Sequence, residues 1–293
     1  MKKFLCLLAV FVLVLFAQCP VFAEGKNVVV SFYPLYIFAL NVIGDVPEIS
    51  LSSLSSGQAG CLHDYQLATG DMVVLSQADL FLINGAGMES FLEKAAEAFP
   101  GLRTVSCSEG IELIRNNEGA ETEFNAHVWL DPANAIIMVK NIRDALCELL
   151  PEKKTEFSEN ADEYIQRLEE LDITIESGLY SLENRDIVTF HEAFPYFAKA
   201  YGLNVVAVIA LEPDEGISPR MLALLSDQVI AAGCPPLFTE PQYPSDAAAA
   251  LSAETGAAIW ELDPAVTGPM TKDAYENTML RNMEILIDAL GNE

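Results

Sequence analysis

The residues with the clearest capacity for chemistry are the three histidines of the chain, His63, His127 and His191. His63 lies in the loop after the second predicted strand, His127 lies just before a predicted helix, and His191 lies at the carboxyl end of a later strand. Ligands of open α/β sheets bind outside the carboxyl ends of the strands. The three imidazoles can therefore converge on one point.

Two carboxylates occupy a similar place near the end of the chain. Glu240 follows the predicted strand 237–239, and Asp263 follows the predicted strand 257–262. Three neutral imidazoles with one carboxylate form a closed set of four ligands that suits tetrahedral Zn²⁺, whereas Mn²⁺ prefers more carboxylate oxygen. The candidate metal ligands are His63, His127, His191 and Asp263.

Each of these residues also has an ordinary structural explanation. A single histidine at a strand end is more often packed or hydrogen-bonded than bound to a metal. Asp263 precedes Pro264, where an aspartate often stabilises a turn or caps a helix, and Glu240 could be a simple loop carboxylate. The joint pattern favours a metal site, because every histidine of the chain occupies the same topological place.

Two runs of alternating strands and helices are predicted to position these residues. The strands are expected at 27–32, 49–54, 79–84, 103–106, 186–190, 203–211, 237–239 and 257–262. The helices are expected at 35–43, 71–78, 89–98, 131–150, 194–201, 219–232, 245–255 and 272–290, with Asp131 as the N-cap and Pro132 as the first residue of the fourth helix. Apolar strands separated by helices favour parallel sheets that are covered on both faces.

The segment 151–182 separates the two runs. It is highly charged and carries apolar residues at helical spacing, which predicts one long helix. Two helices with a break near 172–175 are the alternative. We therefore expect an α/β protein of two lobes, each a four-stranded, mainly parallel sheet with flanking helices, bridged by one long helix. The expected boundaries are 24–150 for the N-terminal lobe, 151–183 for the bridging helix and 184–293 for the C-terminal lobe.

The charge balance argues against several classes of partner. The 293 residues include 16 Lys and Arg against 43 Asp and Glu, which gives a formal net charge of −27. Such an acidic surface repels phosphate groups, so nucleic acids and anionic membrane surfaces are not expected as partners. Hydrophobic residues make up 51% of the chain, so it is not a disordered acidic tail.

The segment 1–23 is expected to be a cleaved signal peptide. It has a basic start, an uncharged apolar stretch and a small-residue site before Glu24, which is the usual pattern. An uncleaved membrane anchor is the alternative. Lipidation of Cys19 would need a small residue before it, where the bulky Gln18 stands. We expect an exported protein of the periplasm or cell envelope without a lipid anchor at Cys19.

Cleavage would leave four cysteines, Cys61, Cys107, Cys147 and Cys234. No CxxC pair occurs in the chain, so a cysteine-based zinc knuckle is excluded. Four cysteines allow three full disulfide connectivities, and the sequence does not choose among them.

Six motifs occur along the chain in an order that is typical of one family. They are HDYQ at 63–66 with Gly70-Asp71, INGAGMESFL at 83–92, HVWLDP at 127–132, FHEAFPYFAKAYGL at 190–203, FTEPQ at 238–242 and LDP at 262–264. Together they resemble the metal-binding receptors of ABC importers, in the cluster that contains the zinc-specific and the manganese- or zinc-binding members. The resemblance covers essentially the whole chain after residue 23.

The resemblance implies two α/β lobes bridged by a rigid helix, with the metal between them. His63, His127 and His191 match the first three ligands of the family, and Asp263 matches the fourth. Glu240 matches a glutamate whose role differs between members, so it is the substitute carboxylate. A histidine at the third position is typical of zinc members. The implied function is a monomeric, high-affinity zinc receptor, not an enzyme, that delivers Zn²⁺ to the membrane permease of an ABC importer.

The chain departs from the family pattern in two places near the ligands. Cys61-Leu62 stands before the first histidine, where many members have an acidic residue and a proline, and the Cys61 thiolate could join or replace a ligand. The segment 116–125 is short and lacks the histidine-rich loop of many zinc members, so no additional zinc capture by a loop is expected.

Three alternatives to a zinc receptor follow from the residues. A manganese or mixed-metal receptor would use the same ligands. A secreted zinc hydrolase would need an open coordination position and a general base; His191-Glu192 begins like HExxH, but Pro195 stands where the second histidine is required. An adhesion or interaction module would use the metal only for structure.

Overall fold

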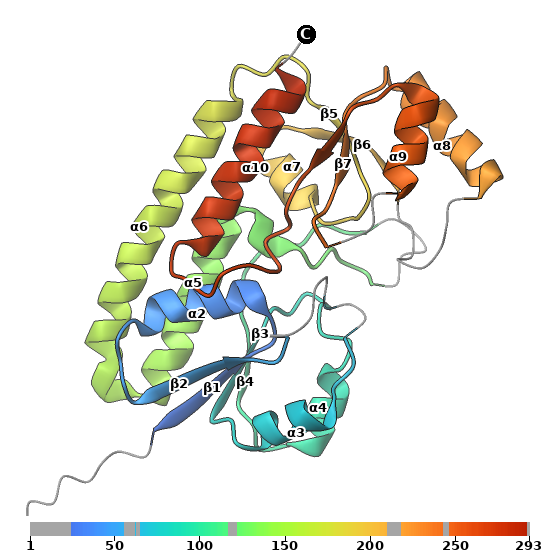
Figure 1. The fold of residues 1–293 in the computed structure, drawn as a ribbon. Helices are drawn as coiled ribbons and strands as arrows, with labels where there is room; N and C mark the ends of the chain where they lie inside the picture. The colour runs from blue at the N-terminus through green and yellow to red at the C-terminus, as the bar shows by residue number, and fades with distance from the viewer. Residues whose placement is uncertain are drawn as a thin grey trace, which may run out of the picture.

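Two parallel sheets form the frame of the molecule (Figure 1). The structure is a computed structural model that describes residues 25–55, 62, 65–116, 122–209, 218–242 and 246–291. One four-stranded sheet has the strand order β2-β1-β3-β4, and the other has the order β6-β5-β7-β8. All strand pairs are parallel. The predicted α/β fold with two four-stranded parallel sheets is therefore confirmed.

The N-terminal sheet consists of β1 (Lys26–Val30), β2 (Ile49–Ser53), β3 (Leu80–Ile83) and β4 (Thr104–Ser106). Its helices are α2 (Tyr33–Ile43), α3 (Thr69–Ser76) and α4 (Leu92–Ala98). The central strand β3 is apolar and buried over its whole length, because both faces of a central parallel strand are covered. This sheet and its helices occupy the lower part of Figure 1.

The C-terminal sheet consists of β5 (Asp186–Thr189), β6 (Asn204–Val208), β7 (Leu237–Thr239) and β8 (Ile259–Glu261). Its helices are α7 (Pro195–Tyr201), α8 (Pro219–Ala231), α9 (Asp246–Thr255) and α10 (Ala274–Leu290). β6 ends before the predicted strand 203–211 does, and residues 210–217 lie outside the described part of the chain.

Two long helices connect the sheets. α5 (Pro132–Leu149) begins where predicted, with Pro132 in its first turn and the Asp131 carboxylate accepting a hydrogen bond from the Ala133 N–H at 2.8 Å. After a short 3-10 turn, η3 (Pro151–Lys153), the chain enters α6 (Lys154–Leu179), an unbroken helix of 26 residues. The prediction of one long helix is confirmed, and the alternative with a break near 172–175 is wrong.

The helix α6 packs against elements of both halves of the molecule. Its neighbours are α5, α2 of the N-terminal half and α10 of the C-terminal half, and in Figure 1 it runs along both sheets. The buried side chains recur at helical spacing, which places them in one apolar stripe. They are Phe157, Ala161, Tyr164, Ile165, Leu168, Leu171, Ile175 and Leu179.

The predicted helix 89–98 begins three residues late, at Leu92, because Glu89 turns inward. The Glu89 carboxylate accepts hydrogen bonds from the backbone N–H of Asn84 at 2.6 Å and of Gly85 at 3.1 Å. It also accepts one from the Ser31 hydroxyl at 2.7 Å. These bonds tie the ends of β1 and β3 together and hold residues 89–91 in a turn instead of a helix.

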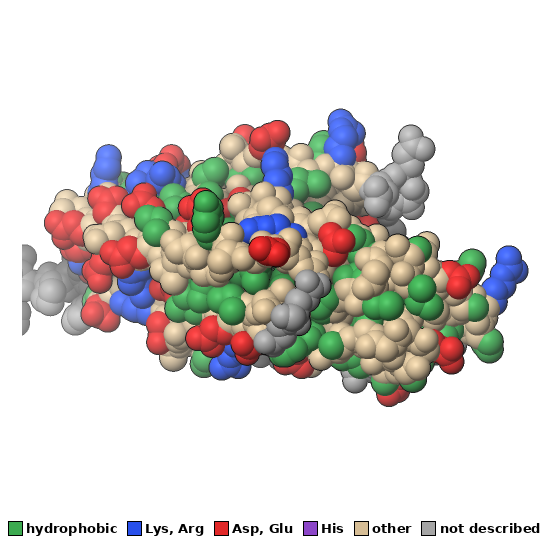
Figure 2. All heavy atoms as spheres, turned by 90° about the horizontal axis from the view of Figure 1, so that it is seen from above, with side chains coloured by type: hydrophobic (Ala, Val, Ile, Leu, Met, Phe, Trp, Pro, Cys, Tyr) green, Lys and Arg blue, Asp and Glu red, His purple; other side chains and the backbone are tan. Residues whose placement is uncertain are grey.

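On the face shown in Figure 2, acidic and basic side chains are scattered among groups of apolar ones. Cys107 is buried and Cys147 and Cys234 are half-buried, and all three are free thiols.

Among the described residues, none of the helices has the length and apolar character needed to cross a membrane.

Candidate metal centre

His127 is held by the carboxyl edge of the N-terminal sheet. It precedes the 3-10 turn η2 (Val128–Leu130), and its side chain is 2% exposed. Asn84, the residue after β3, donates a side-chain hydrogen bond to the Ala126 carbonyl at 2.9 Å. Because Glu89 in turn holds the Asn84 backbone, the peptide that carries His127 is fixed to the ends of two central strands.

The His127 ring also has a specific partner, Asn125. The Asn125 Oδ1 atom accepts a hydrogen bond from the His127 backbone N–H at 3.0 Å and lies 3.2 Å from His127 Nδ1. The Asn125 amide nitrogen donates to the Glu192 carbonyl at 2.7 Å. An amide oxygen only accepts, so these contacts favour a proton on His127 Nδ1 and a lone pair on Nε2.

His191 and Glu240 form a pair at the edge of the C-terminal sheet. They follow the neighbouring strands β5 and β7. His191 Nδ1 lies 3.0 Å from Glu240 Oε1 and 3.3 Å from Oε2, and Glu240 is 4% exposed. A carboxylate that accepts the Nδ1–H leaves the lone pair on Nε2. This arrangement is typical of metal-binding histidines.

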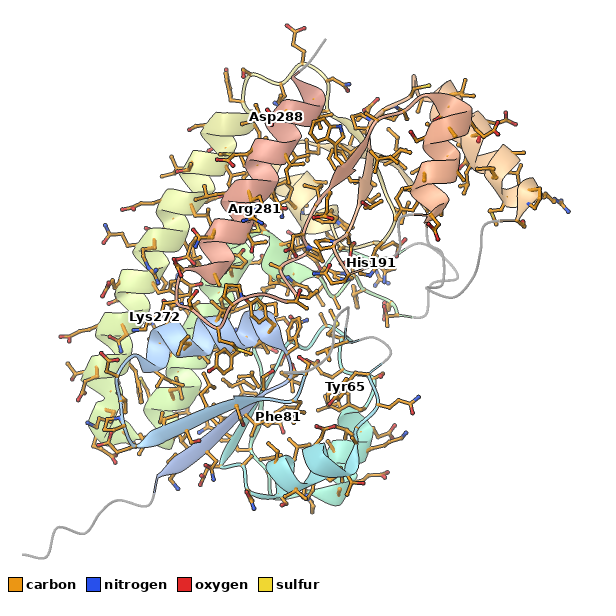
Figure 3. All side chains as sticks on the ribbon, viewed as in Figure 1. Tyr65, Phe81, His191, Lys272, Arg281 and Asp288 are labelled. Carbon is orange, nitrogen blue, oxygen red and sulfur yellow. The ribbon has the colours of Figure 1, made fainter. Side chains whose placement is uncertain are left out.

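The structure brings His127 and His191 together, although they come from different halves of the chain. Their ring centroids lie 4.7 Å apart with an interplanar angle of 84°. Figure 3 shows His191 on the side of the C-terminal half that faces the N-terminal half. Trp129 packs 5.2 Å from the His127 ring, so one side of the pair is covered by a buried apolar residue.

Asp263 lies at the same edge, after β8. Its carboxylate accepts hydrogen bonds from the Ala265 backbone N–H at 2.8 Å and from the Gln242 side chain at 3.4 Å. Burial raises the pKa of the Asp263 carboxyl, while these bonds and the Arg281 charge act to lower it. These contacts give Asp263 a turn-stabilising role, and its part in metal binding stays a prediction.

His63 lies outside the described residues, as does Cys61 beside it. Tyr65, two positions later, is buried against Phe91 with ring centroids 5.5 Å apart. The Tyr65 hydroxyl donates to the Asp71 carboxylate at 2.7 Å, which explains the pairing of HDYQ with Gly70-Asp71 in one motif. In the part of the chain that the structure describes, no three His, Cys, Asp or Glu side chains are grouped to hold a metal.

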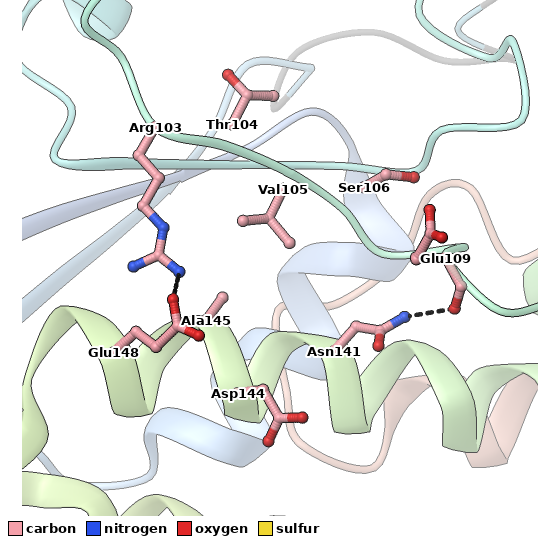
Figure 4. A pocket seen from close by; sticks show the side chains of 9 residues that line it. All are labelled: Arg103, Thr104, Val105, Ser106, Glu109, Asn141, Asp144, Ala145 and Glu148. Carbon is pink, nitrogen blue, oxygen red and sulfur yellow. Dashed lines mark hydrogen bonds and ion pairs between the residues drawn. The ribbon is translucent and has the colours of Figure 1, made fainter.

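A shallow surface pocket lies elsewhere, between β4 and α5 (Figure 4). Its nine lining residues include Arg103, which pairs with the Glu148 carboxylate, and Asn141, which hydrogen-bonds the Glu109 carbonyl. None of the candidate metal ligands lines it.

Three buried polar residues of this region were not predicted to have a role in it. Asn84 and Glu89 belong to the recognised motif at 83–92, yet nothing in their spacing indicates that they hold the His127 segment. Asn125 stands two residues before His127, just outside the HVWLDP motif. For Asn125, the polar side chain two positions before a candidate ligand is the only signal that the sequence offers.

Comparison with known proteins gives one family and several relatives. The model of the family described as zinc-uptake complex component A, periplasmic, matches residues 28–289. The zinc-binding protein AdcA of Streptococcus pyogenes serotype M6 is 30% identical over all of this chain and 63% of its own length. The chain thus spans less than two thirds of the length of the AdcA relatives that it matches.

Two further relatives are matched over most of their length. The high-affinity zinc uptake system protein ZnuA of Bacillus subtilis strain 168 is 29% identical over 91% of this chain and 88% of its own. The solved structure of a mutant of the laminin-binding adhesin Lmb from Streptococcus agalactiae is 28% identical. That structure superimposes with a TM-score of 0.80 and covers 91% of this chain and 100% of its own.

Proposed function

The chain belongs to the zinc-uptake complex component A family, and from that premise we propose that it is a high-affinity zinc receptor that delivers Zn²⁺ to the permease of an ABC importer. The observation that carries the proposal is the approach of His127 and His191 from the two halves, at 4.7 Å between ring centroids. Each ring has an oxygen acceptor at Nδ1, which suits metal binding through Nε2.

The proposed ligands are His63, His127, His191 and Asp263. In this assignment Glu240 orients His191 instead of binding the metal, because its carboxylate faces the Nδ1 side of the ring. Zn²⁺ prefers four nitrogen and oxygen ligands in tetrahedral geometry, whereas Mn²⁺ prefers more oxygen ligands in octahedral geometry. The proposed ligand set therefore suits Zn²⁺ better. Glu240 remains the substitute ligand if Asp263 keeps its turn-stabilising role.

Such a receptor binds and releases an ion and does not need to catalyse a reaction. The family is one of solute receptors, and we propose that this chain catalyses no reaction. We further propose that it is exported to the periplasm or cell envelope, that Cys19 carries no lipid, and that it acts as a monomer without nucleic acid. The ion would be released when the permease shifts the two halves relative to one another.

A direct titration tests the proposal. Metal-free protein competes for Zn²⁺ with a chromophoric chelator, and one tight equivalent per chain is expected. Mn²⁺ in excess should displace zinc poorly, because three of the four ligands are imidazoles. Two or more tight equivalents, or displacement of zinc by an equal concentration of Mn²⁺, would count against the assignment.

The likeness to Lmb gives a second candidate function, adhesion to laminin. Lmb is a laminin-binding adhesin with the same fold. Binding of the zinc-loaded and the metal-free protein to laminin-coated surfaces tests this function, with serum albumin as the control protein. Saturable binding at micromolar protein would support adhesion, and binding no greater than that to albumin would reject it.

A further inference from the structure

Asn125 makes more specific contacts than its position in a loop requires. It is 3% exposed. Its side-chain oxygen faces both the His127 ring and the His127 backbone, and its side-chain nitrogen faces the Glu192 carbonyl. Its own carbonyl accepts a hydrogen bond from the Tyr196 hydroxyl at 2.8 Å. All its polar side-chain atoms are thus engaged beside the two proposed ligands.

These contacts fix the orientation of the Asn125 amide. The Glu192 carbonyl and the His127 N–H are an acceptor and a donor, so only one orientation of the amide satisfies both. In that orientation the oxygen faces His127 Nδ1. We propose that Asn125 is a positioning residue of the metal centre, which holds His127 in the tautomer whose Nε2 can bind zinc. The role rests on the proposed function, because His127 is a ligand only there.

One of the two contacts that orient the Asn125 amide comes from the other half of the molecule. Asn125 precedes the bridging helix in the chain, whereas Glu192 and Tyr196 follow it. An amide differs from the Glu240 carboxylate in one respect. A carboxylate presents an acceptor whichever way it turns, but a reversed amide would present N–H groups to His127 Nδ1 and favour the wrong tautomer. The local bond from the His127 N–H and the bond to Glu192 from the other half both favour the amide orientation that presents the oxygen to His127 Nδ1.

Three variants separate the contributions of Asn125. Asn125→Leu keeps the branched shape of the side chain at a larger volume and removes both polar groups. Asn125→Asp keeps an acceptor toward His127 and loses the donor to Glu192. Asn141→Leu is the matched control, because Asn141 donates two hydrogen bonds to the Cys107 and Glu109 carbonyls at 2.8 and 2.9 Å on another part of the surface.

The first measurement is made without metal. Nitrogen-15 spectra of the three histidine rings at a pH where they are neutral report which ring nitrogen carries the proton, and His127→Gln assigns the signals. His127 is expected as the Nδ1–H tautomer in the wild type, in Asn125→Asp and in Asn141→Leu. In Asn125→Leu the Nε2–H tautomer should gain population. Asn125→Ala removes the same groups with less bulk and replaces the leucine variant if that variant does not fold.

The second measurement is zinc affinity by chelator competition. Asn125→Leu should bind zinc about 10- to 100-fold more weakly, as is typical when a hydrogen-bond partner of a ligand is lost. Asn125→Asp should recover most of that loss, and Asn141→Leu should bind as the wild type does. A tautomer and an affinity both unchanged in Asn125→Leu would overturn the proposal, as would equal losses in the aspartate and leucine variants. If the wild type itself bound no zinc, the proposed function would fail, while the ring spectra would still decide whether Asn125 sets the tautomer.

Discussion

At the scale of single residues, the two histidines differ in the charge of their partners. His191 faces the carboxylate of Glu240, and His127 faces the neutral amide of Asn125. Hydrogen bonds to ionised groups are stronger than those to neutral groups, and a stronger acceptor makes the imidazole a better ligand. In the proposed zinc site, His191 would therefore be the stronger ligand and His127 the weaker one.

The first prediction follows from removal of either ring. His127→Ala and His191→Ala should each weaken zinc binding by more than the 10- to 100-fold that is typical for loss of a ligand's partner, because each would remove one of the proposed metal bonds. Chelator competition measures the effect, and thermal unfolding of the metal-free variants checks the fold. A variant of either histidine that bound zinc as the wild type does would remove that residue from the ligand set.

The second prediction concerns the two carboxylates. Asp263→Asn keeps an acceptor for the Ala265 N–H and loses the anionic ligand, so it should lower zinc affinity strongly with little change in stability. Glu240→Gln can still accept the His191 Nδ1–H, so its loss should be smaller, within about 10- to 100-fold. Normal affinity in Asp263→Asn with the larger loss in Glu240→Gln would reverse the two assignments.

At the scale of elements, one arginine joins three helices, through an ion pair to one and a hydrogen bond to another. Arg167 on α6 contacts Glu276 on α10 at 3.0 Å and the side chain of Asn41 on α2. Burial raises the pKa of Glu276, while Arg167 is among the groups that lower it. Replacement of Arg167 by methionine would leave a largely buried carboxylate without its cation, which costs about 1–3 kcal/mol.

The third prediction is the pH dependence of that cost. In Arg167→Met the pKa of Glu276 in the folded state should rise further above the unfolded value of ~4.3. A raised folded pKa gives stability that is present at low pH and is lost as the pH rises through it. The variant should therefore be destabilised more at pH 7 than at pH 4, as measured by urea unfolding against the wild type.

An exposed ion pair provides the control for this prediction. Lys199 and Glu112 lie 3.8 Å apart, with side chains 61% and 91% exposed, and such pairs contribute little. Lys199→Met should change the unfolding free energy slightly at either pH. A destabilisation of Arg167→Met that is the same at pH 4 and pH 7 would show that lost packing, not the charge of Glu276, is responsible.

Most elements could be predicted from the sequence because their causes are local. The cap formed by Asp131 and Pro132 and the apolar stripe of α6 are patterns of neighbouring residues. The start of α4 could not be predicted, because Glu89 is drawn out of the helix by Ser31, a residue 58 positions away. The spacing of residues along the chain does not indicate that Ser31 and Glu89 are in contact.

The candidate site divides in the same way. The histidines were predicted from their positions at strand ends, and His127 and His191 lie together in the structure. The groups that contact their Nδ1 atoms were not predicted. Glu240 lies 49 residues from His191 in the chain, and the amide of Asn125, which contacts His127, is held by Glu192, 67 residues away. The His191–Glu240 contact depends on the pairing of β5 with β7, and the Asn125–Glu192 contact depends on the packing of the two halves. Neither can be deduced from one segment of sequence at a time.

At the scale of the whole molecule, the two halves are tied directly behind the histidines. The Trp129 indole donates to the Pro264 carbonyl at 2.8 Å, and the Tyr275 hydroxyl donates to the Trp129 carbonyl at 2.6 Å. The Tyr33 hydroxyl donates to the Pro269 carbonyl at 2.8 Å. A metal that binds both His127 and His191 adds a bond between the same halves, so zinc should stabilise the molecule as one unit.

The fourth prediction is that this stabilisation depends on pH. Zn²⁺ needs neutral imidazoles, and an unperturbed histidine titrates near ~6.5. The zinc-bound folded state thus binds fewer protons than the unfolded state, so zinc-linked stability is present above about pH 6.5 and is lost as the pH falls. Free zinc at a thousandfold excess over Kd contributes about 4 kcal/mol.

The gap in melting temperature between zinc-loaded and chelated protein should therefore shrink between pH 7 and pH 5. Three competing protons should make the change steep, with up to about three log units of affinity lost per pH unit once all three rings are protonated. His191→Ala offers a comparison within the same chain, because with two competing protons its residual zinc affinity should fall less steeply. A zinc-induced shift that stays constant from pH 7.5 to 5 would mean that the ligands are not histidines. The approach of His127 and His191 would then have to be explained by packing alone.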